Sequence, residues 1–174
     1  ALREDDFRVT TVLDQEELIG VEPGDTADSL HGVAFDIGTT TVVGVLVDLK
    51  TGRTAATCSR TNPQVRFGDD VVSRINHAAN NGTGLPELHE EIIDCINDMI
   101  TELAQAADLR RHRIYEISLV GNTTMNHILM SVDPSSIAQA PYVSVFRRGM
   151  YCRARELGIR IAPNGRLFLL PNIA

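Results

Sequence analysis

Residues 33–48 read V-A-F-D-I-G-T-T-T-V-V-G-V-L-V-D, two apolar runs on either side of a short turn rich in hydroxyl groups. Val and Ile occur in these runs, and one Gly with three Thr separates them, which predicts a β-hairpin with a tight turn. The rest of the chain is therefore expected to build a sheet around this hairpin.

The turn itself has two interpretations. Gly38 can adopt backbone angles that are closed to other residues, so the amides of Gly38, Thr39 and Thr40 can converge on one anion. Asp36, at the end of the first run, places a carboxylate where Mg²⁺ with its waters would lie beside a phosphate. Alternatively, the hydroxyl groups only satisfy their own backbone. The local pattern leaves both interpretations open.

Composition excludes several classes of protein. The 174 residues are 43% hydrophobic and 22% charged, with a net charge of −7, which suits one large domain or one domain plus a tail. No basic stripe accompanies aromatic residues, so we expect no nucleic-acid partner. No apolar run is long enough for a membrane span and no signal peptide opens the chain, so we expect no membrane partner and a cytoplasmic location.

The three cysteines, Cys58, Cys95 and Cys152, are far apart and form no C-x-x-C pair. They predict buried free thiols rather than ligands of zinc or of an iron–sulfur cluster. The chain starts with Ala and stops just after an apolar run at 167–170, so we expect that further sequence belongs at both ends.

The periodicity of hydrophobic residues and the positions of turn and helix-capping residues predict the remaining elements. Residues 1–30 are expected to be an arm or linker with one β-like patch at 7–13. The expected elements are a third, edge strand at 54–61, a short helix at 70–77, a long helix at 86–107, a strand at 114–120, a helix at 123–130 and, after a loosely patterned stretch, a hairpin of 159–161 with 167–169. The short helix is expected to bury Val71, Val72 and Ile75.

A second turn rich in polar groups lies where the strand at 114–120 runs into Gly121, Asn122 and Thr123, which open the next helix. Such a junction points amides and a helix N-terminus toward a ligand. An ordinary capped strand–helix turn is the alternative.

The order of elements predicts the topology. Three antiparallel strands followed by right-handed crossovers give a mixed α/β sheet of strand order 3-2-1-4-5 with helices on its faces. This is the ribonuclease H-like layout. It places the turn after the first strand and the turn after the fourth side by side at one sheet edge, where ligands bind in such sheets. We therefore expect the two turns to form one site.

The string D-I-G-T-T-T at 36–41 resembles the first phosphate motif of the superfamily that contains actin, sugar kinases and heat-shock chaperones. Further segments together resemble the reductive activators of corrinoid proteins. These are V-E-P-G-D at 21–25, N-P-Q at 62–64 with Gly68 and Asp70-Val71, G-N-T-T-M at 121–125, and L-P-N-I-A at 170–174. The resemblance spans most of residues 21–174.

The resemblance implies an ATP-dependent activator with a [2Fe–2S] ferredoxin domain, a linker, a middle domain and an ATP-binding domain. Such activators return a corrinoid cofactor from Co(II) to Co(I) for a methyltransferase system, so the implied partner is a corrinoid protein. Residues 1–30 would be a linker or the tail of the middle domain. Residues 31–174 would be the first lobe of a two-lobe actin-like ATPase domain, with an irregular insertion at about 131–166. The chain carries neither the ferredoxin cysteines nor a second lobe, so alone it is expected to be inactive.

The resemblance also assigns site residues by position. Asp36 would hold Mg²⁺ through water. The phosphate turn would be Gly38, Thr39, Thr40 and Thr41, and the opposite wall Gly121, Asn122 and Thr123. Secondary candidates are Asn62 and Gln64, near the cleft or the partner surface, and Asn172, at a hinge. None of these residues is an obvious base for hydrolysis.

Two other functions fit the same sequence. One is a small-molecule kinase of the same superfamily, in which an acidic base takes the proton of a substrate hydroxyl. The other is a non-catalytic interaction lobe, in which the Thr-rich turns are only structural. A lobe without its second half could also form a homodimer through its open face.

Overall fold

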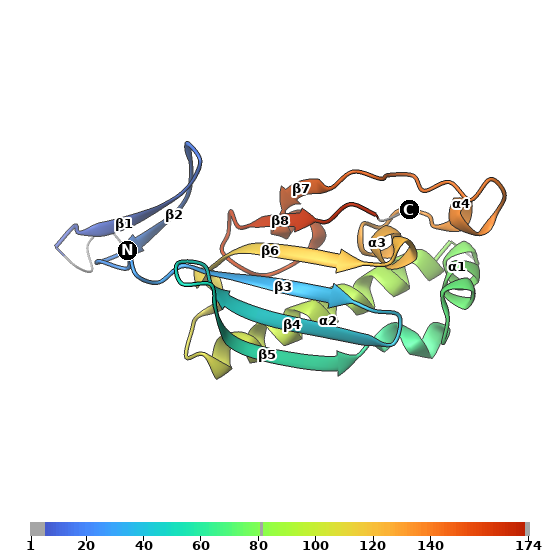
Figure 1. Cartoon of the computed structure of the whole chain (residues 1–174), viewed down its shortest axis with the longest axis horizontal. Coiled ribbons are helices and arrows are strands. Elements are labelled where there is room, and N and C mark those ends of the chain that lie inside the picture. The colour runs from blue at the N-terminus through green and yellow to red at the C-terminus, as the bar shows by residue number, and fades with distance from the viewer. Residues whose placement is uncertain (1–5, 81, 173–174) are drawn as a thin grey trace.

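A six-stranded mixed sheet forms the centre of the computed structural model, which describes residues 6–80 and 82–172 (Figure 1). The strand order is β5-β4-β3-β6-β8-β7. The strands are β3 (His31–Ile37), β4 (Thr41–Asp48), β5 (Arg53–Thr61), β6 (Ile114–Gly121), β7 (Met150–Arg153) and β8 (Arg166–Leu169). Strands β3, β4 and β5 are antiparallel neighbours, β6 lies parallel to β3 and β8 parallel to β6, and β7 is antiparallel to β8.

The helices pack on one face of this sheet. The long helix α2 (Gly84–Ala106) crosses behind the strands in Figure 1, and α3 (Thr123–Leu129) shares its core. The other helical segments are α1 (Val71–Ala79), α4 (Ser135–Ala138) and the 3₁₀ turns η1 (Pro63–Phe67), η2 (Arg111–Arg113) and η3 (Ala154–Leu157). Side chains such as Phe35, Ile96 and Ile117 are almost fully buried between α2 and the sheet.

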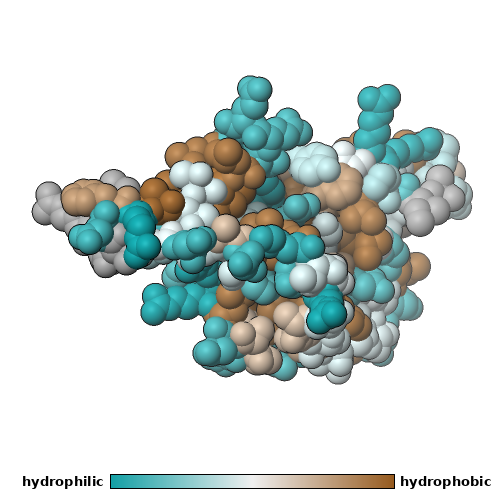
Figure 2. Space-filling model, turned by 60° about the vertical axis from the view of Figure 1, so that its left-hand side comes forward, coloured by the Kyte–Doolittle hydropathy of each residue, from teal (hydrophilic) through white to brown (hydrophobic). Residues whose placement is uncertain are grey.

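The opposite face of the sheet is open in the described part of the chain. Ala34, Asp36 and Val120 are exposed there. Helices on both faces were expected, but the described helices that are long enough to bury an apolar stripe all pack on the face that α2 covers. Figure 2 shows several separate hydrophobic patches among hydrophilic residues on the face that it displays.

Most local expectations are confirmed. The edge strand is β5, the two central helices are α1 and α2, and the strand and helix after residue 113 are β6 and α3. One detail of α1 is wrong: Val72 is exposed, whereas Arg74 and Ile75 are buried. The buried face of α1 therefore carries Arg74, and the apolar side chain of Val72 faces water.

The N-terminal segment is a second small sheet rather than an arm with one β-like patch. Strands β1 (Val9–Asp14) and β2 (Glu17–Pro23) pair antiparallel, apart from the main sheet (Figure 1). Ile19 packs with Tyr115, and the buried Glu22 accepts a hydrogen bond from the Tyr115 hydroxyl at 2.5 Å and pairs with Arg113. A buried acid breaks the polar–apolar alternation, so β2 has no clear strand signal in the sequence.

The expected hairpin of 159–161 with 167–169 is wrong. Strand β8 pairs with β7 instead, so the sheet gains an outer strand. Residues 159–161 are not a strand, because the backbone amide of Arg160 donates to Asn97 Oδ1 at 2.8 Å while Ile159 and Ile161 are buried in the core.

A helix must be both long and apolar to cross a bilayer. Within residues 6–80 and 82–172, none of the helices combines the two properties.

Candidate functional site

The two hydroxyl-rich turns meet at one edge of the sheet. Ile37, the last residue of β3, pairs with Gly121, the last residue of β6, because the two strands run parallel. The side-chain amide of Asn122 then donates to the Thr39 hydroxyl across the gap, at 3.0 Å. Thr39 and Asn122, which are 83 positions apart in the chain, therefore lie together at this edge of the sheet, which we call the rim of the site.

The first turn is a two-residue hairpin loop formed by Thr39 and Thr40. The Gly38 amide donates to the Thr41 carbonyl at 2.9 Å and closes the loop. This amide is therefore not available to an anion, contrary to expectation. The reason for glycine also differs, because Gly38 does not have a positive φ. A Cβ atom at Gly38 would lie 2.6 Å from the Thr41 carbonyl oxygen, too close for any side chain.

Three successive carbonyls of this turn accept hydrogen bonds from one side. The Gly38 carbonyl accepts from Asn62 Nδ2 at 2.8 Å, the Thr39 carbonyl from Arg74 Nη2, and the Thr40 carbonyl from the Asn62 amide at 2.8 Å. In a trans peptide the N–H points opposite to the C=O. The amides of Thr39, Thr40 and Thr41 therefore point away from Asn62 and Arg74.

These three amides are the donors that the turn offers. None of them takes part in a turn, loop or cap backbone bond among the described residues. Backbone amides with neighbouring hydroxyls can form an anion-binding concavity where they converge. Of the expected amides of Gly38, Thr39 and Thr40, that of Gly38 is bonded within the turn, so the candidate donors are the amides of Thr39, Thr40 and Thr41.

A buried polar cluster holds the turn from below. Asn62, Gln64 and Arg74 are at most 1% exposed. Asn62 Oδ1 accepts from the Gln64 amide at 3.0 Å, Gln64 Nε2 donates to the Leu88 carbonyl at 2.8 Å, and Arg74 Nη1 donates to Gln64 Oε1 at 3.1 Å. Asn62 and Gln64 were expected near the cleft or the partner surface; both are buried beneath the turn, and their hydrogen bonds fix its backbone.

Sequence reasoning missed Arg74. Its position gives a weak signal, because it lies three residues after Val71 and four before Ala78, on the stripe of α1 that apolar residues define. A charged residue on such a stripe indicates a buried polar contact, but not its partner.

The second turn provides the opposite wall. Asn122 is the N-cap of α3, and its Oδ1 accepts from the Met125 amide at 3.0 Å while its Nδ2 reaches Thr39. The capped-turn interpretation is therefore confirmed, since Asn122 caps the helix, and the same side chain contacts the first turn; ligand binding at this junction stays a prediction. Helix α3 has only seven residues. Gly121 keeps the strand ends close, because a Cβ there would lie 3.0 Å from the Ile37 carbonyl oxygen.

Asn172 reaches this wall through Asn126. The Asn126 side-chain amide donates to the Gly121 carbonyl at 3.1 Å and to Asn172 Oδ1 at 2.7 Å. Asn172 Nδ2 in turn donates to the Phe146 carbonyl at 2.8 Å. The last described residue thus lies against the second turn; its role at a hinge stays a prediction.

His127 ties Thr123 to the loosely patterned segment. Its Nδ1 lies 2.7 Å from the Thr123 carbonyl oxygen, and its Nε2 accepts from the Val145 amide at 3.2 Å. These contacts require a neutral ring protonated at Nδ1. Burial agrees with this, because it lowers the pKa of His127.

Asp36 lies exposed at the end of β3, on the open face of the sheet. It borders a hollow of about 260 Å³ whose walls include Val43, Val45 and Val120. No cluster of three or more metal-binding side chains occurs in the described residues. A single carboxylate fits Mg²⁺ that is held mainly by phosphate and water, not a metal cage made by the protein.

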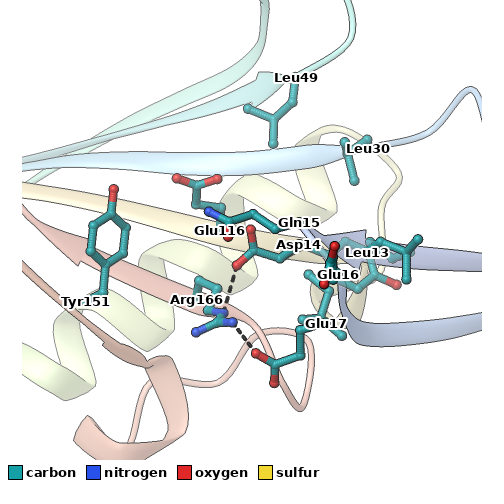
Figure 3. Close-up of a pocket in the computed structure, with 13 residues that line it drawn as sticks. Leu13, Asp14, Gln15, Glu16, Glu17, Leu30, Leu49, Glu116, Tyr151 and Arg166 are labelled. Atoms are coloured by element: carbon teal, nitrogen blue, oxygen red, sulfur yellow. Dashed lines mark hydrogen bonds and ion pairs between the residues drawn. The ribbon is translucent and has the colours of Figure 1, made fainter.

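A larger hollow, about 600 Å³, lies between the β1–β2 hairpin and the main sheet (Figure 3). Its walls carry Asp14, Glu17 and Glu116, and Arg166 is already paired with the first two. Carboxylates repel phosphate groups, so this hollow does not suit an anionic ligand.

Comparisons with known proteins agree with one another. A family model described as the RACo middle region matches residues 31–174. The chain is 29% identical, over 165 residues, to the corrinoid activation enzyme RamQ of Eubacterium limosum, covering 94% of the chain and 28% of RamQ. A solved structure, a reductive activator for corrinoid, iron-sulfur protein, superposes with a TM-score of 0.87 at 35% identity, covering 99% of the chain and 28% of that protein. The chain thus spans little more than a quarter of these relatives.

Proposed function

The chain belongs to the RACo middle region family, and we propose that it works as part of a longer activator that returns a corrinoid cofactor from Co(II) to Co(I) with the help of ATP. RamQ is a corrinoid activation enzyme, and the similar solved structure is a reductive activator for corrinoid, iron-sulfur protein. One electron passes from the donor to cobalt. ATP binding or hydrolysis favours the reducing state of the protein because the two states differ in their affinity for the nucleotide.

The contribution of this chain is the phosphate site between the two turns. The observation that carries this assignment is the set of three carbonyls held from beneath, which leaves the Thr39, Thr40 and Thr41 amides pointing the other way. The Asn122 side chain closes the rim, and Asp36 is placed to bind Mg²⁺ through water when the nucleotide brings it. The metal would neutralise charge on the phosphate groups.

The remaining assignments belong to the same proposal. Residues 31–174 form the first ribonuclease H-like lobe of a two-lobe actin-like ATPase domain, with the five expected strands in the order 3-2-1-4-5, and residues 1–30 lead into it. The intact protein carries a [2Fe–2S] ferredoxin domain, is cytoplasmic, and serves a corrinoid protein of a methyltransferase system. Self-association through the open sheet face is tested by measuring the mass in solution.

The test uses the intact activator and its corrinoid protein. Asp36→Ala and Gly38→Val are each expected to abolish nucleotide-stimulated formation of Co(I), followed by its absorption spectrum. Asp94→Ala is the matched control, because Asp94 is an exposed carboxylate on α2, outside the two turns. Normal Co(I) formation in both site variants would remove the phosphate assignment.

A second experiment addresses this chain alone. Without a second lobe to complete a nucleotide site, the 174-residue chain is expected not to hydrolyse ATP. Measurable hydrolysis that Asp36→Ala eliminates would show that the site is complete without another lobe.

A further inference from the structure

The guanidinium of Arg74 is buried among uncharged groups. Arg74 is 0% exposed. Its Nε donates to the Gly68 carbonyl at 3.0 Å, its Nη1 to Gln64 Oε1 at 3.1 Å and toward Met125 Sδ at 3.1 Å, and its Nη2 to the Thr39 carbonyl. Every one of these acceptors is neutral.

No carboxylate forms an ion pair with Arg74 among residues 6–80 and 82–172. The acids that act on it, Asp69 and Asp70, are exposed at the start of α1. Burial lowers the pKa of Arg74, but an arginine side chain stays protonated in proteins. Buried charges are normally paired, because removing a charge from water is costly. Within the described residues, this positive charge therefore has no counter-charge in contact with it.

This charge acts on the phosphate turn through one peptide group. Arg74 Nη2 donates to the Thr39 carbonyl, and the N–H at the other end of the same peptide belongs to Thr40. A charged donor on the carbonyl polarises the peptide and strengthens the N–H as a donor. The Thr40 amide points away from Arg74, toward the side where the other two amides also point.

We propose that Arg74 is the buried counter-charge of the anion bound at this turn, and that it acts as a positioning residue through the Thr39–Thr40 peptide. The inference rests on the proposed function, because it identifies what the site recognises: the charge of a polyphosphate rather than the rest of the nucleotide. An anion at the three amides supplies the negative charge that the buried arginine lacks.

The test measures the affinity of the intact activator for Mg²⁺-ATP, Mg²⁺-ADP and adenosine by calorimetry. Arg74→Met is expected to weaken ATP binding about tenfold, or about 1.4 kcal/mol, to weaken ADP binding less, and to leave adenosine unchanged. Arg74→Lys keeps the charge and is expected to retain most of the affinity. Arg66→Met is the matched control, since Arg66 is exposed and already paired with Glu91.

A second variant keeps the test decisive if Arg74→Met does not fold. Gln64→Glu places a carboxylate where Gln64 Oε1 now accepts from Arg74, and so gives the arginine an internal partner. A counter-charge role predicts weaker ATP binding in this variant, whereas a purely structural role predicts unchanged binding.

The outcomes separate the counter-charge role from the proposed function. A wild-type activator that binds no ATP contradicts the proposed function itself. If the wild type binds ATP and the folded Arg74 and Gln64 variants bind it equally well, only the counter-charge role is wrong. An equal loss of affinity for ATP and adenosine also contradicts it, because adenosine carries no charge.

Discussion

Asn122 lies in the second turn and contacts the first, and the roles of its side-chain oxygen and nitrogen can be tested separately. Its Oδ1 accepts from the Met125 amide at 3.0 Å and caps α3, while its Nδ2 donates to the Thr39 hydroxyl at 3.0 Å. Asn122→Asp keeps the capping oxygen, removes the donor to Thr39 and adds a negative charge at the rim. Asn122→Ala removes both bonds and adds no charge.

Asn122→Ala should lose more stability than Asn122→Asp, whereas Asn122→Asp should lose more affinity for ATP. Loss of an N-cap costs about 1 kcal/mol, and loss of an exposed hydrogen bond costs about 0.5 kcal/mol. We therefore expect Asn122→Ala to lower the free energy of unfolding by about 1.5 kcal/mol and Asn122→Asp by only about 0.5 kcal/mol. In the proposed phosphate site the new carboxylate adds a like charge, and two like charges at about 6 Å cost roughly 0.7–3 kcal/mol for dielectric constants between those of water and a protein surface.

Urea unfolding gives the free energies, and calorimetry with Mg²⁺-ATP gives the affinities, both on the intact activator. Asn122→Asp should bind ATP at least about threefold more weakly, yet be the more stable variant. Asp48→Ala is the matched control, because it removes a carboxylate bond of 2.9 Å to the Lys50 amide at the opposite end of β4, away from both turns. If Asn122→Asp binds ATP as tightly as the wild type does, Asn122 does not face the phosphate and its assignment to the rim is refuted.

Three further predictions concern the support of the site and the fold. Burial lowers the pKa of His127 below its ordinary 6.5, so the unfolded chain binds more protons than the folded chain, and stability should fall as the pH drops below about 6.5. In His127→Gln the urea midpoint should depend less on pH, whereas the exposed-site control His112→Gln should leave that dependence unchanged. Tyr115→Phe leaves the buried Glu22 with one donor fewer, at a cost of about 1–3 kcal/mol, and faster proteolysis of the β1–β2 hairpin would reveal it. Ile96→Ala, at the centre of α2, should destabilise the chain by about 3–4 kcal/mol in thermal unfolding.

The parts of the fold that the sequence predicts are those whose signal is local. Strands β3 and β4 are visible as two apolar runs around a turn, and α2 as an apolar stripe repeated every three or four residues. In both cases the residues that define the element also face the core. Periodicity and burial then agree, and no distant contact is needed to identify the element.

The parts that the sequence does not predict depend on distant partners. Strand β2 buries Glu22, and the contacts with Arg113 and Tyr115, about 90 residues later in the chain, help make that burial tolerable. Residues around Ile159 have the composition of a strand, but a side chain from α2, Asn97, takes up the backbone that a hairpin would use. Polar residues with such partners look like surface residues until the partners are known.

The residues of the candidate site also fall into two groups: those that a local pattern reveals and those that depend on distant partners. This difference affects how such turns can be recognised. The residues proposed to line the phosphate site lie next to one another, at 38–41 and 121–123, so a short motif reveals them. The residues that orient the turn, Asn62 and Arg74, lie 24 and 35 positions away from the carbonyls that they bind. A Thr-rich hairpin without such donors beneath it would keep its carbonyls free to turn either way, and its amides would not be fixed on one side. The motif therefore identifies a candidate, and the buried donors to its carbonyls are what distinguish a phosphate turn from a hairpin that only satisfies itself.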